Sequence, residues 1–237
     1  MTARHRFMVG SAVALVLGLA GILLGVFLDP RRFLFSYLTA WAFYVSTAIG
    51  ALFVLMIGHA ARARWFAGVR RLIEYPSSTF PVLLVLALPI FLGIGTLFEW
   101  AGPWDDLPKE TQKILAHKHV WMNVPFYVVR TCFYMLVFWA FAHFLIAGSL
   151  REDRGYDEVR KRRLQRIGSG GIPICAFVTT WASFDWLMSL DPTWYSTIFG
   201  VYFWAGAFIA GLSILSILVT IFRSLKLLPP EIGAAHQ

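Results

Sequence analysis

Residues 7–28 read FMVGSAVALVLGLAGILLGVFL and contain no charged side chain. About 20 helical residues span the ~30 Å hydrocarbon layer of a bilayer, so this run is long enough to cross it. Five further apolar runs follow, at residues 33–58, 80–98, 124–147, 168–190 and 195–222. We therefore predict an all-α polytopic integral membrane bundle of six transmembrane helices, forming one membrane domain over residues 1–237.

The composition supports this fold class. Apolar residues make up 58% of the chain and charged residues 14%, so lipid must cover much of the surface. Lipid cannot satisfy an exposed backbone, and the runs are too long for barrel strands, which leaves helices. Arg4 and Arg6 precede the first run as in a signal peptide, but the run is longer than a usual signal core, and we expect it to stay as a helix.

The net charge of +8 is explained by topology and does not indicate a nucleic-acid partner. Fifteen Lys and Arg side chains fall in the N-terminal tail, the second and fourth connections and the C-terminal tail, against five in the other connections. Cytoplasmic connections of membrane proteins are enriched in Lys and Arg. We therefore predict that both termini are cytoplasmic.

Two helix starts are marked by an Asp–Pro pair. Asp29 and Asp191 are each followed by proline, and an acidic N-cap with proline at the first helical position is a typical helix start. We expect Asp29 to cap the second helix and Asp191 the sixth. The matching tripeptides at residues 28–30 and 190–192 are also consistent with a duplicated hairpin. Pro89 should bend the third helix.

The connections carry weaker signals. Trp65, Val69, Leu72 and Ile73 can share one face of a short helix on the cytoplasmic leaflet, although a plain basic loop fits as well. Residues 151–166 mix both charges and predict a solvated connection, with a contact for lipid or a partner as the alternative. On the outer side, three tryptophans predict interface anchors or a contact for an external subunit: Trp100, Trp104 and Trp121.

Two ionisable residues interrupt the apolar runs. Arg130 and Asp185 lie at similar depths near the outer ends of the fourth and fifth runs, so a buried pair is geometrically allowed. Charges at membrane depth are costly and are functional candidates by default. We hypothesise that the pair belongs to a proton path or a quinone-adjacent site, together with Tyr127, Tyr134 and Trp186. The alternative is a structural ion pair that fixes helix packing.

Histidines and cysteines give no metal prediction. His143 and His59 near the inner helix ends raise the question of a haem, but a two-haem membrane cytochrome would need four placed histidines. We expect His143 to be a buried hydrogen-bonding group or a proton-carrying step. Cys132 and Cys175 lie at different depths, which argues against a disulfide, a zinc site or an iron–sulfur cluster.

Three segments resemble one known family. Residues 183–208, SFDWLMSLDPTWYSTIFGVYFWAGAF, closely resemble the F subunit of bacterial alternative complex III, a quinol:cytochrome c oxidoreductase. Residues 27–38, FLDPRRFLFSYL, and residues 123–130, NVPFYVVR, resemble the same subunit in the right order. The resemblance covers nearly the whole chain. Members of that family carry more than six membrane helices, so it also implies that a C-terminal half is absent here.

The resemblance implies a multi-pass protein of the bacterial inner membrane, similar to the polysulfide reductase membrane-anchor family. Such a subunit would bind no cofactor by itself, with quinol or menaquinol as a ligand of the complex. Its partners would be a related quinol-binding membrane subunit, an iron–sulfur subunit, multihaem cytochromes c and membrane lipids. Its role would be proton translocation or quinol-site architecture. The alternatives are a secondary transporter and a purely structural membrane scaffold.

Overall fold

The computed structural model describes residues 3–63, 66–105, 107–153, 155 and 157–228. All regular secondary structure in these residues is helical. Six helical segments are long and apolar enough to cross a membrane, which confirms the predicted fold class. Four of them lie in single helices: α1 (Ala3–Leu28), α2 (Pro30–Ala60), α8 (Val124–Glu152) and α10 (Phe199–Ser224). A fifth consists of α9 (Glu158–Trp186) and the 3₁₀ helix that follows it.

The remaining span, Phe66–Leu92, is built from three shorter helices, α3 (Phe66–Ser77), α4 (Phe80–Val85) and α5 (Leu88–Leu92). Three short helices follow α5 in the chain and lie at one end of the bundle: α6 (Ile94–Leu97), η1 (Glu99–Ala101) and α7 (Lys109–Lys118). A short 3₁₀ helix, η2 (Met188–Leu190), follows α9.

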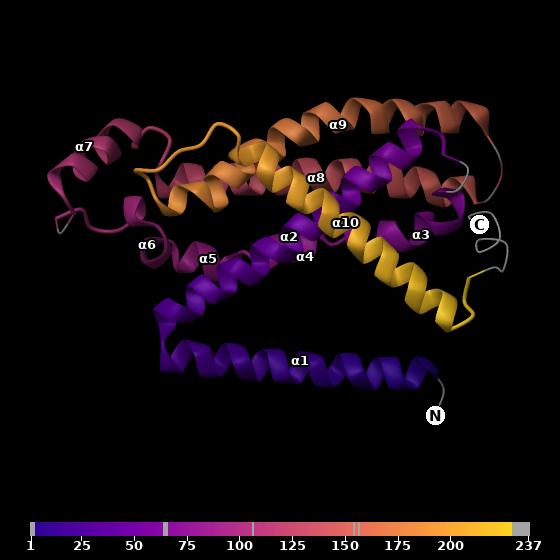
Figure 1. The fold of residues 1–237 in the computed structure, drawn as a ribbon, viewed down its shortest axis with the longest axis horizontal. Helices are drawn as coiled ribbons and strands as arrows, with labels where there is room; N and C mark the ends of the chain where they lie inside the picture. Colours follow the sequence, from indigo (N-terminus) through magenta and orange to yellow (C-terminus); the bar gives the residue numbers. More distant parts are fainter. Residues whose placement is uncertain (1–2, 64–65, 106, 154, 156, 229–237) are drawn as a thin grey trace.

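In Figure 1, α2 runs diagonally through the bundle, while α1 lies apart from the other helices. The start of α1 and the end of α10 lie at the same end of the molecule, as an even number of crossings requires, and α7 lies at the opposite end. We call the end that carries α7 the outer end and the other the inner end, following the predicted orientation. The side of the membrane on which each end lies stays a prediction.

The corner between α1 and α2 forms as the sequence predicts. The Asp29 carboxylate accepts a hydrogen bond of 3.0 Å from the Arg32 amide, and Pro30 occupies the first turn, so Asp29 is the N-cap of α2. Gly25 leaves room for the Phe33 ring, which a methyl group at this position would overlap. Apart from this corner, α1 is exposed along nearly all of its described length.

Glycines allow α2 to approach two other helices closely. A side chain on Gly50 would overlap the backbone carbonyl of Ala207, and one on Gly211 would overlap the backbone of Gly50. In the same way, Gly168 of α9 lies against the backbone of Met56. Without a hydrophobic driving force between helices in lipid, such close packing is a main source of association. The crossing of α10 with α2 is therefore formed by small residues, namely Gly50, Ala207 and Gly211.

The third apolar run does not form one bent helix over residues 80–98, as expected, but is interrupted. Proline at position 89 has no amide hydrogen, and the amide of Ala87 bonds to the carbonyl of Leu84 instead of continuing the α-helical pattern. Side chains of α2 bind carbonyls at the break. The Trp41 indole donates to the Leu83 carbonyl and the Tyr37 hydroxyl to the Leu86 carbonyl, each at 2.8 Å.

Asp191 is not the N-cap of the last helix, so this prediction is wrong. Its carboxylate binds the amides of Thr193 and Trp194, as an N-cap would, but α10 begins only at Phe199. The Lys118 ammonium donates to the Pro192 carbonyl at 2.8 Å, within the segment that separates Asp191 from α10. The duplicated hairpin suggested by the matching tripeptides is therefore not supported at its second helix start.

The short helix predicted after the second span exists as α3, but it packs differently. Val69, Leu72 and Ile73 are buried and share its inward face, whereas Trp65 lies outside the described residues. Its arginines bind acidic residues of the protein instead of pointing at a lipid leaflet. Residues 151–166 are also not a plain connection, because α8 extends to Glu152 and α9 begins at Glu158.

Candidate functional site

Arg130 of α8 and Asp185 of α9 form a buried ion pair near the outer end of the bundle. The guanidinium Nε donates to Asp185 Oδ2 at 2.7 Å and Nη2 donates to Oδ1 at 2.8 Å. The side chains are only 8% and 3% exposed. Two parallel bonds of this kind fix the orientation of both groups and are among the stronger hydrogen bonds in proteins. The pair expected from sequence depth is therefore present.

Two further donors complete the coordination of Asp185. The Tyr134 hydroxyl donates to Oδ2 at 2.8 Å, and the Trp121 indole donates to Oδ1 at 3.2 Å. A carboxylate has two oxygens with about four acceptor positions. With two bonds from Arg130 and one each from Tyr134 and Trp121, all of these positions are used, so the ionised form of Asp185 is held by four donors.

Trp121 is the functional-site residue that the sequence did not identify. Its backbone carbonyl accepts a hydrogen bond of 2.8 Å from Nη1, the remaining guanidinium nitrogen of Arg130. The Arg130 guanidinium carbon also lies 4.3 Å from the ring centroids of Trp121 and of Phe126, within the range of cation–π attraction. Trp121 therefore binds both members of the pair. Its position in a tryptophan-rich outer connection indicated an interface anchor or a contact for an external subunit.

The other predicted site residues surround this pair to different extents. Trp186 is fully buried; its indole donates to the Thr131 hydroxyl at 3.2 Å, and its ring meets the Tyr134 ring edge-on. Tyr127 is also buried, and its ring packs against Phe98 at a centroid distance of 5.2 Å. These contacts join α8 and α9 with the segment that follows the broken third span.

The structure does not bring the histidines to this site. His143 is exposed and its ring lies beside those of Trp139 and Phe144, so the expectation of a buried hydrogen-bonding group is wrong. His59 is buried and lines a different cavity from His143, which gives no support to a haem held by the two. Across the described part of the chain, no cluster of His, Cys, Asp and Glu side chains is placed to hold a metal ion.

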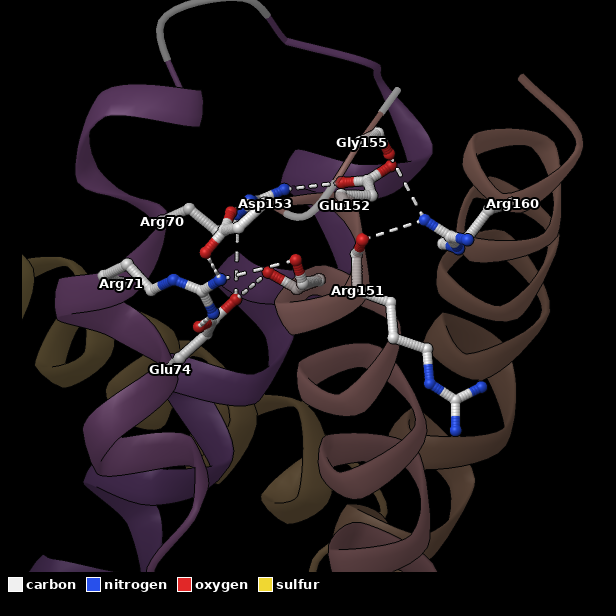
Figure 2. Close-up of polar contacts among 9 residues, drawn as sticks. Arg70, Arg71, Glu74, Arg151, Glu152, Asp153, Gly155 and Arg160 are labelled. Carbon is white, nitrogen blue, oxygen red and sulfur yellow. Dashed lines mark hydrogen bonds and ion pairs between the residues drawn. The ribbon is translucent and has the colours of Figure 1, made fainter. Parts of the chain in front are cut away.

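A second polar cluster, unexpected from the sequence, lies at the inner end. We define the inner ion cluster as Arg70, Arg71 and Glu74 of α3 with Ser149, Glu152 and Asp153 at the end of α8 (Figure 2). Figure 2 shows that the labelled arginine and acidic side chains of this cluster converge across the gap between α3 and α8.

The centre of the inner ion cluster is Glu74, which is only 5% exposed. It accepts hydrogen bonds from the Arg71 guanidinium and from the Ser149 hydroxyl. Arg70 pairs with Glu152 at 2.6 Å and with Asp153 at 2.9 Å. The Arg71 guanidinium, which also binds Asp153, lowers the pKa of that carboxyl below its usual value. The cluster therefore fastens α3 to α8.

The two sites connect α8 to different helices at opposite ends of the bundle. The Arg130–Asp185 pair ties α8 to α9 at the outer end, and the inner ion cluster ties α8 to α3 at the other. The first lies inside segments 123–130 and 183–208, whose family resemblance was noted above, and the second lies outside them. Comparison of the chain with protein-family models and with curated proteins found no match.

Proposed function

We propose that this chain is an integral membrane subunit of a respiratory quinol:cytochrome c oxidoreductase of the alternative complex III type, in the bacterial inner membrane. Its partners would be a related quinol-binding membrane subunit, an iron–sulfur subunit and multihaem cytochromes c. The observation that supports the proposal is the Arg130–Asp185 pair, because both residues lie in the stretches that resemble that family and they meet in a buried network.

Within this proposal, the geometry favours quinol-site architecture over proton carriage for Asp185. A carboxylate that relays protons must offer a free acceptor position to the entering proton. Asp185 has its positions filled by Arg130, Tyr134 and Trp121. The pair then acts as a positioning device that holds the outer ends of α8 and α9 at a fixed separation, where a neighbouring subunit would contact them.

Co-purification tests the assignment to a complex. The tagged chain, isolated in mild detergent from its native membranes, should bring with it a protein with c-type haem absorbance and one with an iron–sulfur electron paramagnetic resonance signal. A chain that is isolated alone under several mild detergents would contradict the proposal. Uptake of a solute by the isolated chain in liposomes would favour a transporter instead.

Asp185→Asn and Arg130→Gln test the role of the pair within that complex. For a positioning role, we expect both variants to reduce assembly and quinol:cytochrome c turnover together, with an unchanged number of protons released per electron. A variant that assembles and transfers electrons but releases fewer protons would instead assign proton carriage to Asp185. Lys113→Gln, at the same end but exposed, is the control and should change neither quantity. Intact turnover in both variants would remove the pair from the function.

A further inference from the structure

The inner ends of α8 and α9 enclose a groove that neither the ion pair nor the inner ion cluster uses. It has a volume of about 360 Å³, which lies within the range of small-ligand pockets. We define the α8–α9 groove by its apolar floor, formed by Phe144, Ala147 and Ile167, and by its basic rim, formed by Arg151, Arg160 and Arg163.

The basic rim carries an excess of positive charge. Besides its three arginines, the groove is lined by one carboxylate, Asp157. Asp157 lies 3.6 Å from the Arg160 guanidinium, which also donates to the backbone carbonyls of Arg151 and Gly155. The protein therefore engages Arg160. One carboxylate cannot balance the three guanidinium groups around it.

Arg151 and Arg163 differ from Arg160 in having uncommitted side chains. Within the part of the chain that the structure describes, neither guanidinium has a hydrogen-bond or ion-pair partner. Figure 2 shows the Arg151 side chain directed away from the inner ion cluster and along the space between α8 and α9, with Arg160 on the facing helix. A guanidinium has five donors and binds phosphate oxygens in a two-pronged arrangement.

The apolar floor distinguishes a lipid from a free anion. Ala147 lies about one turn before Arg151 on α8, and Phe144 lies further toward the middle of the same helix. Although His143 also lines this deeper part, the groove passes from guanidinium groups to a mostly apolar floor in the direction of the membrane interior. A phosphate alone would leave this floor exposed. A phospholipid presents the same order of chemistry, with an anionic headgroup above a hydrocarbon chain.

We propose that the α8–α9 groove binds an anionic phospholipid, with its phosphodiester on Arg151 and Arg163 and the upper part of one acyl chain on the floor beside Phe144 and Ala147. Basic pockets between membrane helices at the cytoplasmic side are suited to such headgroups, and the anionic leaflet supplies them. The volume fits a headgroup and the start of one chain, with the rest of the lipid outside. The site does not depend on the proposed function, because it rests on other residues.

Native mass spectrometry of the delipidated full chain, titrated with phosphatidylglycerol or with zwitterionic phosphatidylcholine, tests the proposal. We expect the wild-type chain to bind phosphatidylglycerol preferentially. The double variant Arg151→Gln/Arg163→Gln should lower that affinity by roughly 25-fold, from two lost headgroup contacts. The control Arg162→Gln/Arg166→Gln removes the same charge from α9 outside the groove and should lower it less than threefold. An equal loss in both double variants would overturn the site.

Ala147→Phe tests the floor without changing any charge. The larger side chain should fill the groove and weaken phosphatidylglycerol binding at least fivefold. This result tests the groove even if the double variant Arg151→Gln/Arg163→Gln does not fold. If Ala147→Phe leaves lipid binding unchanged while inorganic phosphate competes through Arg151 and Arg163, the groove binds a free anion and the lipid proposal fails. Photocrosslinking from position 163 in native membranes to a protein in place of lipid would assign the groove to a partner and also overturn it. Thermal unfolding of each variant confirms that the fold is retained.

Discussion

Gly50 of α2 and Gly211 of α10 face each other without an intervening side chain at the point where the two helices cross. A methyl group on Gly211 would overlap the carbonyl group of Gly50 and the amide nitrogen of Ala51. Backbone atoms cannot rotate away as a side chain can. The crossing distance of these two helices is therefore set by the absence of two side chains.

Gly211→Ala should consequently destabilise the bundle, by about 1–3 kcal/mol, as is typical of overpacking. The control is Gly206→Ala on the same helix, where an added methyl group meets no atom within 4 Å. That substitution should be neutral or slightly stabilising, because alanine favours a helix more than glycine does. Thermal unfolding in detergent measures both. Equal melting temperatures for the two variants would contradict the close crossing.

Breaking the buried ion pair should cost more than breaking an exposed one. Asp185→Asn leaves the Arg130 charge without its partner, and loss of one member of a buried pair typically costs about 3–5 kcal/mol. The exposed pair Lys113–Glu110, with side chains 74% and 85% exposed, provides the comparison. Lys113→Gln should cost less than about 1 kcal/mol.

The double variant Arg130→Met/Asp185→Leu separates the free-energy cost of burying two charges from the attraction between them. It replaces both charges with apolar groups, so it should be more stable than Asp185→Asn alone, because no unpaired charge remains. Unfolding free energies of the single and double variants, measured in one detergent, give the coupling. The matched singles are Arg130→Met and Asp185→Leu, and a double variant as unstable as the sum of these two would show that the pair does not interact.

The inner ion cluster should make stability depend on pH at the acidic end. Arg71 lowers the pKa of Asp153 in the folded protein, so this carboxylate stabilises the fold above its unfolded pKa of about 3.9 and stops doing so as the pH falls through its lower folded value. Asp153 is half exposed, so the effect should be under about 1 kcal/mol. Asp153→Asn should therefore be less stable than wild type at pH 7, and this difference should shrink as the pH falls below about 3.9. A difference that does not change with pH would contradict the ion-pair origin.

The predicted orientation can be checked by cysteine labelling. In a background with Cys132 and Cys175 replaced by alanine, a membrane-impermeant maleimide should label Glu110→Cys in spheroplasts. It should label Arg162→Cys only after the membrane is permeabilised. Reversed labelling would contradict the inference from the Lys and Arg distribution, and labelling of both from one side would contradict the six-span bundle.

Hydropathy located the spans because the transfer of a side chain into lipid depends little on its neighbours. Hydropathy does not predict where α8 ends and α9 begins, because both helices continue through polar residues outside the apolar spans. Asp157 caps α9 through the Val159 amide at 2.9 Å, and Glu158 pairs with Arg162 one turn later. The cap residue and the ion pair are both features of a helix start, but the many charged residues of this segment are also typical of a solvated connection.

The residues of the two polar sites could also be predicted only in part from the sequence. The depth of Arg130 and Asp185 could be counted along two helices, so their meeting was predictable. Trp121 and Glu74 could not be placed, because each acts only after the chain has folded back: Trp121 at the turn before α8, and Glu74 where α3 meets α8. Asp191 fails differently. It makes the local bonds of a cap, but α10 begins only at Phe199.

The hydrogen bonds from Tyr37 and Trp41 to the broken third span have a mechanical consequence. An interrupted membrane helix is often a joint about which its halves swing, because the freed carbonyls can exchange partners. Here Leu83 and Leu86 are clamped from α2, the helix at the centre of the bundle. The break is therefore braced against α2, and a swinging movement at this point would have to give up both hydrogen bonds.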